Sequence, residues 1–76
     1  MEEQIKEELE KVYRYIEIEV NFIDFGNYEI IIKDDKKDEI DSFMYKYNVN
    51  YTLEFNVSII IDTIDKIILK LFKKEM

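Results

Sequence analysis

Residues 16–33, IEIEVNFIDFGNYEIIIK, alternate apolar and polar side chains on both sides of a single glycine. A period of two predicts strands that bury one face. Gly26 and Asn27 both tolerate a positive φ, so they predict a tight turn. The stretch therefore predicts a β-hairpin, with strands over 15–24 and 28–33.

The residues before this hairpin predict an amphipathic helix over 2–14. Ile5, Leu9 and Val12 recur at spacings of four and three, which places them on one helix face. Acidic residues at the start and Lys11 near the end suit the two ends of the helix dipole.

The residues from 51 onward predict a strand followed by a second helix. Over 51–61, apolar residues at odd positions alternate with mostly polar residues at even positions. Asp62 then suits an N-cap. From Ile64 to Phe72 the apolar residues recur at i, i+3, i+4, i+7 and i+8, which is typical of a helix.

Residues 35–49 fit both periods. A helical stripe would contain Ile40, Phe43, Met44 and Tyr47, and a strand face would contain Phe43, Tyr45, Tyr47 and Val49. We favour the helix, because Asp35 can cap it, and Asp38 and Glu39 would lie in its first turn. The predicted order is therefore α-β-β-α-β-α, with α-β-β-β-β-α as the alternative.

Both orders describe a small two-layer α+β domain that spans residues 1–76. Each predicted strand has one apolar face and one mostly polar face, whereas a sheet covered on both sides reads as continuous apolar runs. We therefore expect an antiparallel-containing sheet with helices on one face only. The other face would carry Glu17, Glu19, Glu29 and Glu54, with Lys33 as its only base and with Ile23, Ile31 and Ile60 as apolar exceptions.

The composition excludes most catalysis and most metal sites. The chain has no His and no Cys, so it lacks the common catalytic triads, a thiol nucleophile and the usual zinc ligands. An EF-hand calcium loop needs a glycine at position six and a glutamate at position twelve, but a loop that starts at Asp34, within the acidic run KDDKKDEID (residues 33–41), has Glu39 and Tyr45 there. We expect no enzyme, no cofactor and no metal.

The net charge of −7 indicates which partners to expect. Phosphate binding requires clustered Lys and Arg, so nucleic acid is a poor direct partner. Carboxylates on a strand repeat about every 6.6–6.8 Å, which resembles the step between phosphates. An acidic surface of this kind can occupy the basic groove of a nucleic-acid-binding protein. The candidate partner-binding residues are Glu17, Glu19, Glu29, Glu54, Asp34, Asp35, Asp38, Glu39, Asp41 and Tyr45.

Tyr45 is included because a helix over 35–49 would expose it, and tyrosine is enriched at interface hot spots. The alternative to mimicry is a structural or regulatory homodimer that associates through Ile31, Ile60 or the last helix, with the acidic residues serving solubility alone.

The N-terminus is acidic where a signal peptide is basic, and no apolar run is long enough for a membrane span. We therefore expect a cytoplasmic protein, in the host cytoplasm if it is viral, with no membrane partner. The absence of Ala and Pro, with abundant Ile, Lys and Asn, suggests an AT-rich genome. This is the general character of small phage-encoded inhibitors, including anti-CRISPR proteins and other DNA mimics, although no motif carries that comparison.

Overall fold

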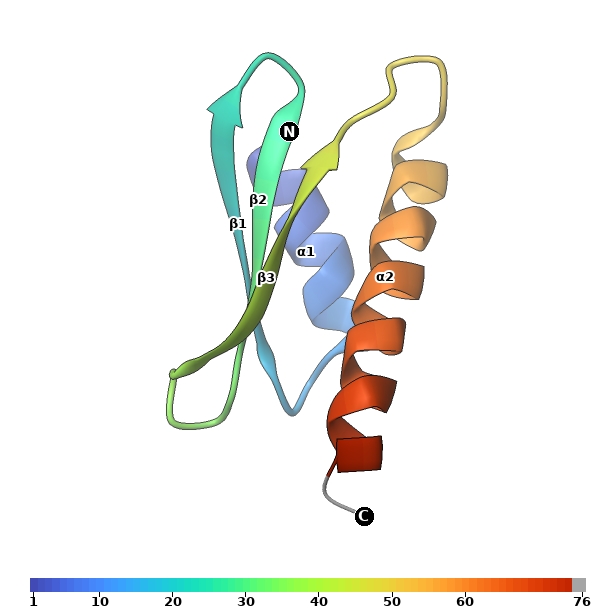
Figure 1. Cartoon of the computed structure of the whole chain (residues 1–76). Coiled ribbons are helices and arrows are strands. Elements are labelled where there is room, and N and C mark those ends of the chain that lie inside the picture. Colours follow the sequence, from blue (N-terminus) through green and yellow to red (C-terminus); the bar gives the residue numbers. More distant parts are fainter. Residues whose placement is uncertain (75–76) are drawn as a thin grey trace.

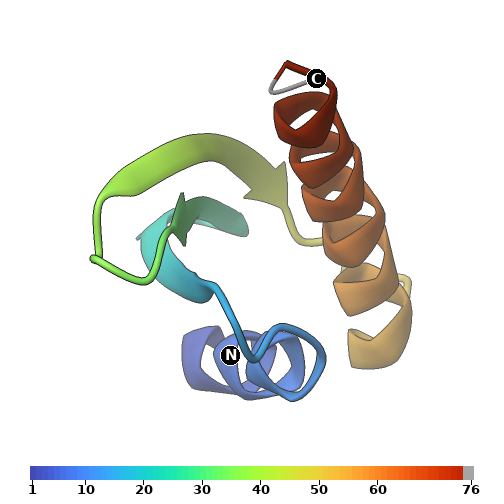
Figure 2. The same ribbon diagram turned by 90° about the horizontal axis from the view of Figure 1, so that it is seen from below.

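The chain forms two helices and a three-stranded antiparallel sheet in the order α-β-β-β-α (Figure 1). The computed structural model describes residues 1–74, with side chains up to Leu71. The elements are α1 (Glu2–Val12), β1 (Glu17–Asp24), β2 (Asn27–Lys33), β3 (Glu39–Lys46) and α2 (Leu53–Lys74). Both helices lie on the concave side of the curved sheet (Figure 2). The predicted α+β class, with helices on one face, is confirmed.

The predicted hairpin and first helix are present. Strands β1 and β2 pair antiparallel with Val20 opposite Ile30, and Gly26 adopts φ 73° in the turn between them. Helix α1 ends at Val12, two residues earlier than predicted, because Tyr13 has already turned to an extended conformation.

The core lies between the sheet and the two helices. Its buried members come from four of the five elements, and half-buried Phe43 and Tyr45 of β3 pack against them. The buried apolar set is Ile5, Leu9, Ile18, Val20, Tyr28, Ile30, Ile32, Val57, Ile60 and Ile64. The even-numbered residues of β1 and β2 therefore face the helices, as their alternation predicts.

The helix favoured over 35–49 is wrong, because this segment contains β3. Phe43 pairs with Ile30 and Tyr45 with Tyr28, so β3 completes the sheet and turns its aromatic side chains toward the helices. Asp35 does not cap a helix, and Glu39 begins the strand. The aromatic alternation prevailed over the capping pattern because a third strand buries these rings against the sheet.

The strand predicted over 51–61 is also wrong, because α2 begins at Leu53. Thr52, not Asp62, caps this helix, since its hydroxyl accepts a hydrogen bond from the Phe55 N–H at 3.1 Å. Asp62 lies inside the helix and pairs with Lys66 at 3.1 Å. Residues 51–61 fit a helical stripe as well as an alternating pattern. The fold buries the helical stripe, which contains Val57, Ile60 and Ile64.

Of the three isoleucines expected on the polar face of the sheet, Ile23 lies near the end of β1 and is 50% exposed, whereas Ile60 and Ile31 have other environments. Ile60 belongs to α2 and is fully buried in the core. Ile31 does face away from the helices, yet it is only 9% exposed. Lys33, two residues along the same strand, reaches Glu19 on β1 at 3.3 Å, and Glu19 lies opposite Ile31. Neither Ile31 nor Ile60 forms an exposed apolar surface.

Each outer strand of the sheet has one outward backbone N–H that a carboxylate binds. Glu2 of α1 accepts from the Phe22 N–H of β1 at 2.9 Å. Asp41 accepts from the Ser42 N–H of β3 at 2.8 Å. Outward N–H groups of edge strands are docking points for other chains, so these two bonds partly close both edges.

Candidate functional site

The acidic stretch at residues 33–41 forms the loop between β2 and β3, and one carboxylate organises it. The Asp34 side chain accepts hydrogen bonds from the backbone N–H groups of Lys36, at 2.9 Å, and Asp38, at 3.0 Å. The Lys37 N–H donates to the Asp34 carbonyl at 3.0 Å, and Lys37 itself adopts φ 67°. The loop is therefore a hydrogen-bonded turn, and the charged side chains of residues 35–38 are exposed to solvent.

The sheet pairing brings further acidic residues next to this loop. Lys33 of β2 lies between Glu17 of β1 and Glu39 of β3, its partners in the register. Its ammonium group contacts Glu19 at 3.3 Å, so the charge of Glu19 is already paired within the molecule. We call the group formed by Glu17, Asp34, Asp35, Asp38, Glu39 and Asp41 the acidic end.

The other predicted partner-binding residues lie elsewhere. Glu29 faces the same side of the sheet, but it lies opposite Asn21 and Met44, farther toward the β1–β2 turn. Glu54 is in the first turn of α2, at the opposite end of the molecule from the acidic end (Figure 1). Tyr45 was expected to be exposed, but it is half-buried and donates a hydrogen bond to Asn56.

A shallow hollow of about 370 Å³ lies beside the acidic end, between the α1–β1 connector and the β2–β3 loop. It is lined by Glu10, Arg14, Tyr15, Ile16, Glu17, Ile18, Asp34, Asp35 and Lys37. Four acidic and two basic side chains share this lining, so it suits contact with charged protein side chains better than an apolar ligand.

At the other end of the molecule, the buried Asn56 holds the connector between β3 and α2. Its amide oxygen accepts from the Tyr45 hydroxyl and from the Asn48 N–H at 2.9 Å. Its amide nitrogen donates to the carbonyls of Asn48, at 3.0 Å, and Thr52, at 2.9 Å. The sequence does not point to this residue, because a polar position in an alternating stretch predicts a side chain that faces solvent.

Large apolar side chains are exposed around this connector and the nearby β1–β2 turn. We call Phe22, Ile23, Phe25, Val49, Tyr51 and Phe55 the apolar end. The Tyr47 N–H donates to the Gly26 carbonyl at 2.7 Å, which ties the connector to the turn. The turn residue Phe25 could have been identified from the sequence, since a turn tip rarely buries its side chains.

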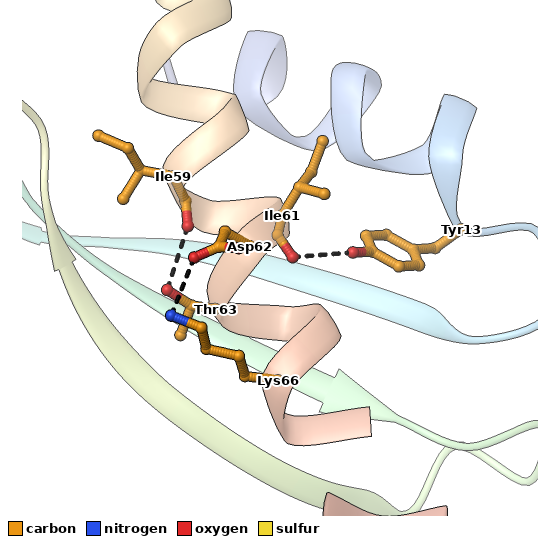
Figure 3. A network of polar contacts seen from close by, with 6 residues as sticks. All are labelled: Tyr13, Ile59, Ile61, Asp62, Thr63 and Lys66. Atoms are coloured by element: carbon orange, nitrogen blue, oxygen red, sulfur yellow. Dashed lines mark hydrogen bonds and ion pairs between the residues drawn. The ribbon is translucent and has the colours of Figure 1, made fainter. Parts of the chain in front are cut away.

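Tyr13 connects the end of α1 to the middle of α2. Its hydroxyl contacts the Ile61 carbonyl at 3.2 Å (Figure 3) and the Asp65 carboxylate at 2.6 Å. Burial, the hydrogen bond to Asp65 and the charge of Asp65 all raise the pKa of Tyr13. The phenol therefore remains a donor at physiological pH and serves packing between the helices.

No family model, curated protein or solved structure matches the chain. Among residues 1–74, no helix combines the length and the apolar character that a membrane crossing requires. In the same part of the chain, no three acidic side chains gather as a metal site would require. The candidate site therefore rests on surface geometry and charge.

Proposed function

We propose that the chain is a small protein-binding module whose acidic end occupies the basic nucleic-acid channel of a partner protein. It would act as an inhibitor of the DNA-mimic kind, of which anti-CRISPR proteins are one example. The observation that carries the proposal is the convergence of acidic side chains from two strands, β1 and β3, and from the β2–β3 loop at a single end of the molecule.

The placement of these side chains at one end supports the proposal. Neighbouring strands lie about 4.7–4.9 Å apart, so the backbone positions of Glu17 and Glu39, on either side of Lys33, lie about 9–10 Å apart across the sheet. The aspartates of the loop continue this acidic row beyond the end of the strands. A row of this kind presents several charges to one basic groove and accelerates encounter by electrostatic steering.

Lysines within the same end reduce its charge and help to design the test. The loop carries Lys36 and Lys37 beside its three aspartates, and Lys33 neutralises Glu19. Reversing Glu19 would therefore break an internal ion pair as well as change the surface. Glu17 and Asp35 are exposed and have no ion-pair partner among the described residues, so they are the better positions for charge reversal.

The test starts with capture of a partner from a lysate of the source organism or its host, followed by elution with salt and with duplex DNA. A partner that binds nucleic acid, leaves as the salt rises and is displaced by DNA supports the proposal. Glu17→Lys combined with Asp35→Lys is expected to weaken binding at least about tenfold, which corresponds to about 1.4 kcal/mol.

Glu3→Lys combined with Glu54→Lys is the matched control. It makes the same change in net charge on exposed residues in the first turns of the two helices, away from the acidic end. The control is expected to bind like the unaltered chain. Binding that resists salt and DNA, or that the control pair weakens equally, would contradict the proposal.

A further inference from the structure

The apolar end combines residues from two segments that are distant in the sequence. Phe25 at the tip of the β1–β2 turn is 96% exposed, and Val49 in the β3–α2 connector is 86% exposed. The hydrogen bond from the Tyr47 N–H to the Gly26 carbonyl holds these segments together. Figure 1 places both at the end of the sheet opposite the β2–β3 loop.

The exposed area of this end is close to what a stable interface needs. An aromatic side chain presents about 150–250 Å². Phe22, Phe25, Tyr51 and Phe55 are 55%, 96%, 46% and 50% exposed, so together they leave about 500 Å² of aromatic surface in water. With Ile23 and Val49 added, the area approaches the roughly 800 Å² that each partner contributes to a standard interface.

The distribution of charge sets how a second copy can occupy this end. A chain with a net charge of −7 repels its own copies, and a dimer through the apolar ends brings together only the acids beside that end, Asp24 and Glu54 among them. The molecule is 40 Å long and 21 Å wide. Contact between two apolar ends places the acidic ends at the far poles, several Debye lengths of about 8–10 Å apart.

We propose that two copies of the chain associate through their apolar ends as a two-fold symmetric dimer, with Phe25 and Val49 near its centre. A two-fold interface uses the same patch from both copies, so no second binding surface is required. A domain of this size buries only about 60% of its unfolded surface, so additional apolar burial stabilises it appreciably. The dimer leaves both acidic ends free, and it does not depend on the proposed function.

The test is sedimentation equilibrium of the full chain between about 5 and 500 µM, a range suited to micromolar dissociation constants. The unaltered chain is expected to be dimeric, with little change at high salt. Phe25→Asp and Val49→Asp are each expected to raise the dissociation constant at least about 100-fold, as loss of an interface centre does. Circular dichroism checks that both variants fold, which their high exposure favours.

Tyr15→Asp is the matched control, because Tyr15 is 92% exposed and lines the hollow beside the acidic end. This variant is expected to dimerise like the unaltered chain. Since the chain has no Cys, Asn50→Cys in the connector and Lys36→Cys in the acidic loop give single attachment points. A short bis-maleimide is expected to link two copies of the Asn50→Cys variant and to leave the Lys36→Cys variant unlinked.

A chain that stays monomeric over the whole range would overturn the proposal. Dimerisation that survives Phe25→Asp and Val49→Asp would overturn it as well, because the contact would then lie elsewhere. A monomer that sediments with phosphatidylcholine vesicles, and loses this with Phe25→Asp, would assign the apolar end to a lipid surface instead of a second copy.

Discussion

The two ends of the molecule both reverse the chain next to β2, but they do so with different chemistry. Gly26 adopts φ 73° at the apolar end, and Lys37 adopts φ 67° at the acidic end. Glycine occupies this region freely, whereas an L-residue is strained by roughly 1–2 kcal/mol. The Asp34 carboxylate holds the strained loop through two backbone N–H groups. The comparison indicates that the acidic end carries a charged residue where a glycine would be more stable.

The largest expected effect is the loss of Asn56 at the apolar end. Asn56→Ala leaves the Asn48 N–H and the Tyr45 hydroxyl without their partner, and buried polar groups without partners each cost about 1–3 kcal/mol. Urea denaturation is expected to show a loss of about 3 kcal/mol in the free energy of unfolding. Ser58→Ala, on the exposed side of α2, is expected to change it by less than about 0.5 kcal/mol. Equal effects of the two variants would refute the assignment of Asn56 as the support of the connector.

Gly26→Ala tests whether the positive φ at the β1–β2 turn requires glycine. A Cβ at this position would meet the Tyr47 carbonyl oxygen at 3.6 Å, an ordinary contact, so the cost is expected to come from the positive φ. We expect the unfolding free energy to fall by about 1–2 kcal/mol. Asn is tolerated at positive φ better than Ala, so Gly26→Asn should lose less. If Asn proved as costly as Ala, space and not backbone conformation would limit this turn.

Alkaline pH should weaken the apolar end through Tyr45. Burial is the main cause that raises the pKa of Tyr45 above its ordinary 10.0, and the charges of Tyr47 and Tyr51 add to it. The neutral phenol is favoured in the folded state, so its stabilisation is complete below pH 10 and is lost as the pH rises through the folded pKa. Tyr45→Phe is expected to cost about 1 kcal/mol at neutral pH and to flatten the decline in stability above pH 10.

The alkaline decline should persist in part in this variant, because the pKa values of Tyr13 and Tyr28 are also raised. Tyr15→Phe is the control, since Tyr15 is 92% exposed. Its stability at neutral pH and the decline of that stability above pH 10 should match those of the unaltered chain. An unchanged pH profile for Tyr45→Phe would show that its hydroxyl does not take part in the linkage.

The smallest expected effect is a gain at the acidic end. Lys37→Gly relieves roughly 1–2 kcal/mol of strain, but glycine adds about 0.5–1 kcal/mol of flexibility to the unfolded chain. The net expectation is a stabilisation of about 0.5 kcal/mol, measured by thermal and urea unfolding. Lys36→Gly changes the same charge at a position without positive φ, so it should destabilise slightly. Stabilisation by both variants would point to charge instead of strain.

The sequence predicts the hairpin and α1 well, because in these segments only one period fits. Residues 16–33 alternate around the only glycine of the chain, and a strand pair is the one arrangement that buries Ile18, Val20 and Ile30 together. The prediction that the helices cover one face follows from the same alternation and is also confirmed.

The second half of the chain could not be predicted in this way, because its residues fit two periods at once. Leu53 and Val57 fit the apolar face of the strand predicted over 51–61, and together with Ile60 they also fit one face of a helix. The apolar stripe continues through Ile64 and Ile67, which favours the helix. A helix that begins at Leu53 buries Asn56, so this polar side chain must find hydrogen-bond partners. Whether it can depends on Tyr45 and Asn48, which are distant until the fold has formed. Of the candidate site, the loop acids were predicted together, whereas Glu54 and Tyr45 were placed by the two mistaken elements.

The carboxylates of Glu2 and Asp41 have a consequence that a count of charges does not reveal. Fibrils grow when strands of new molecules add to free backbone groups along the edge of an existing sheet. By binding the outward N–H groups of Phe22 and Ser42, these two residues occupy positions where such growth would begin on β1 and on β3. Protection of the two sheet edges therefore rests on two individual acidic residues as well as on the overall charge.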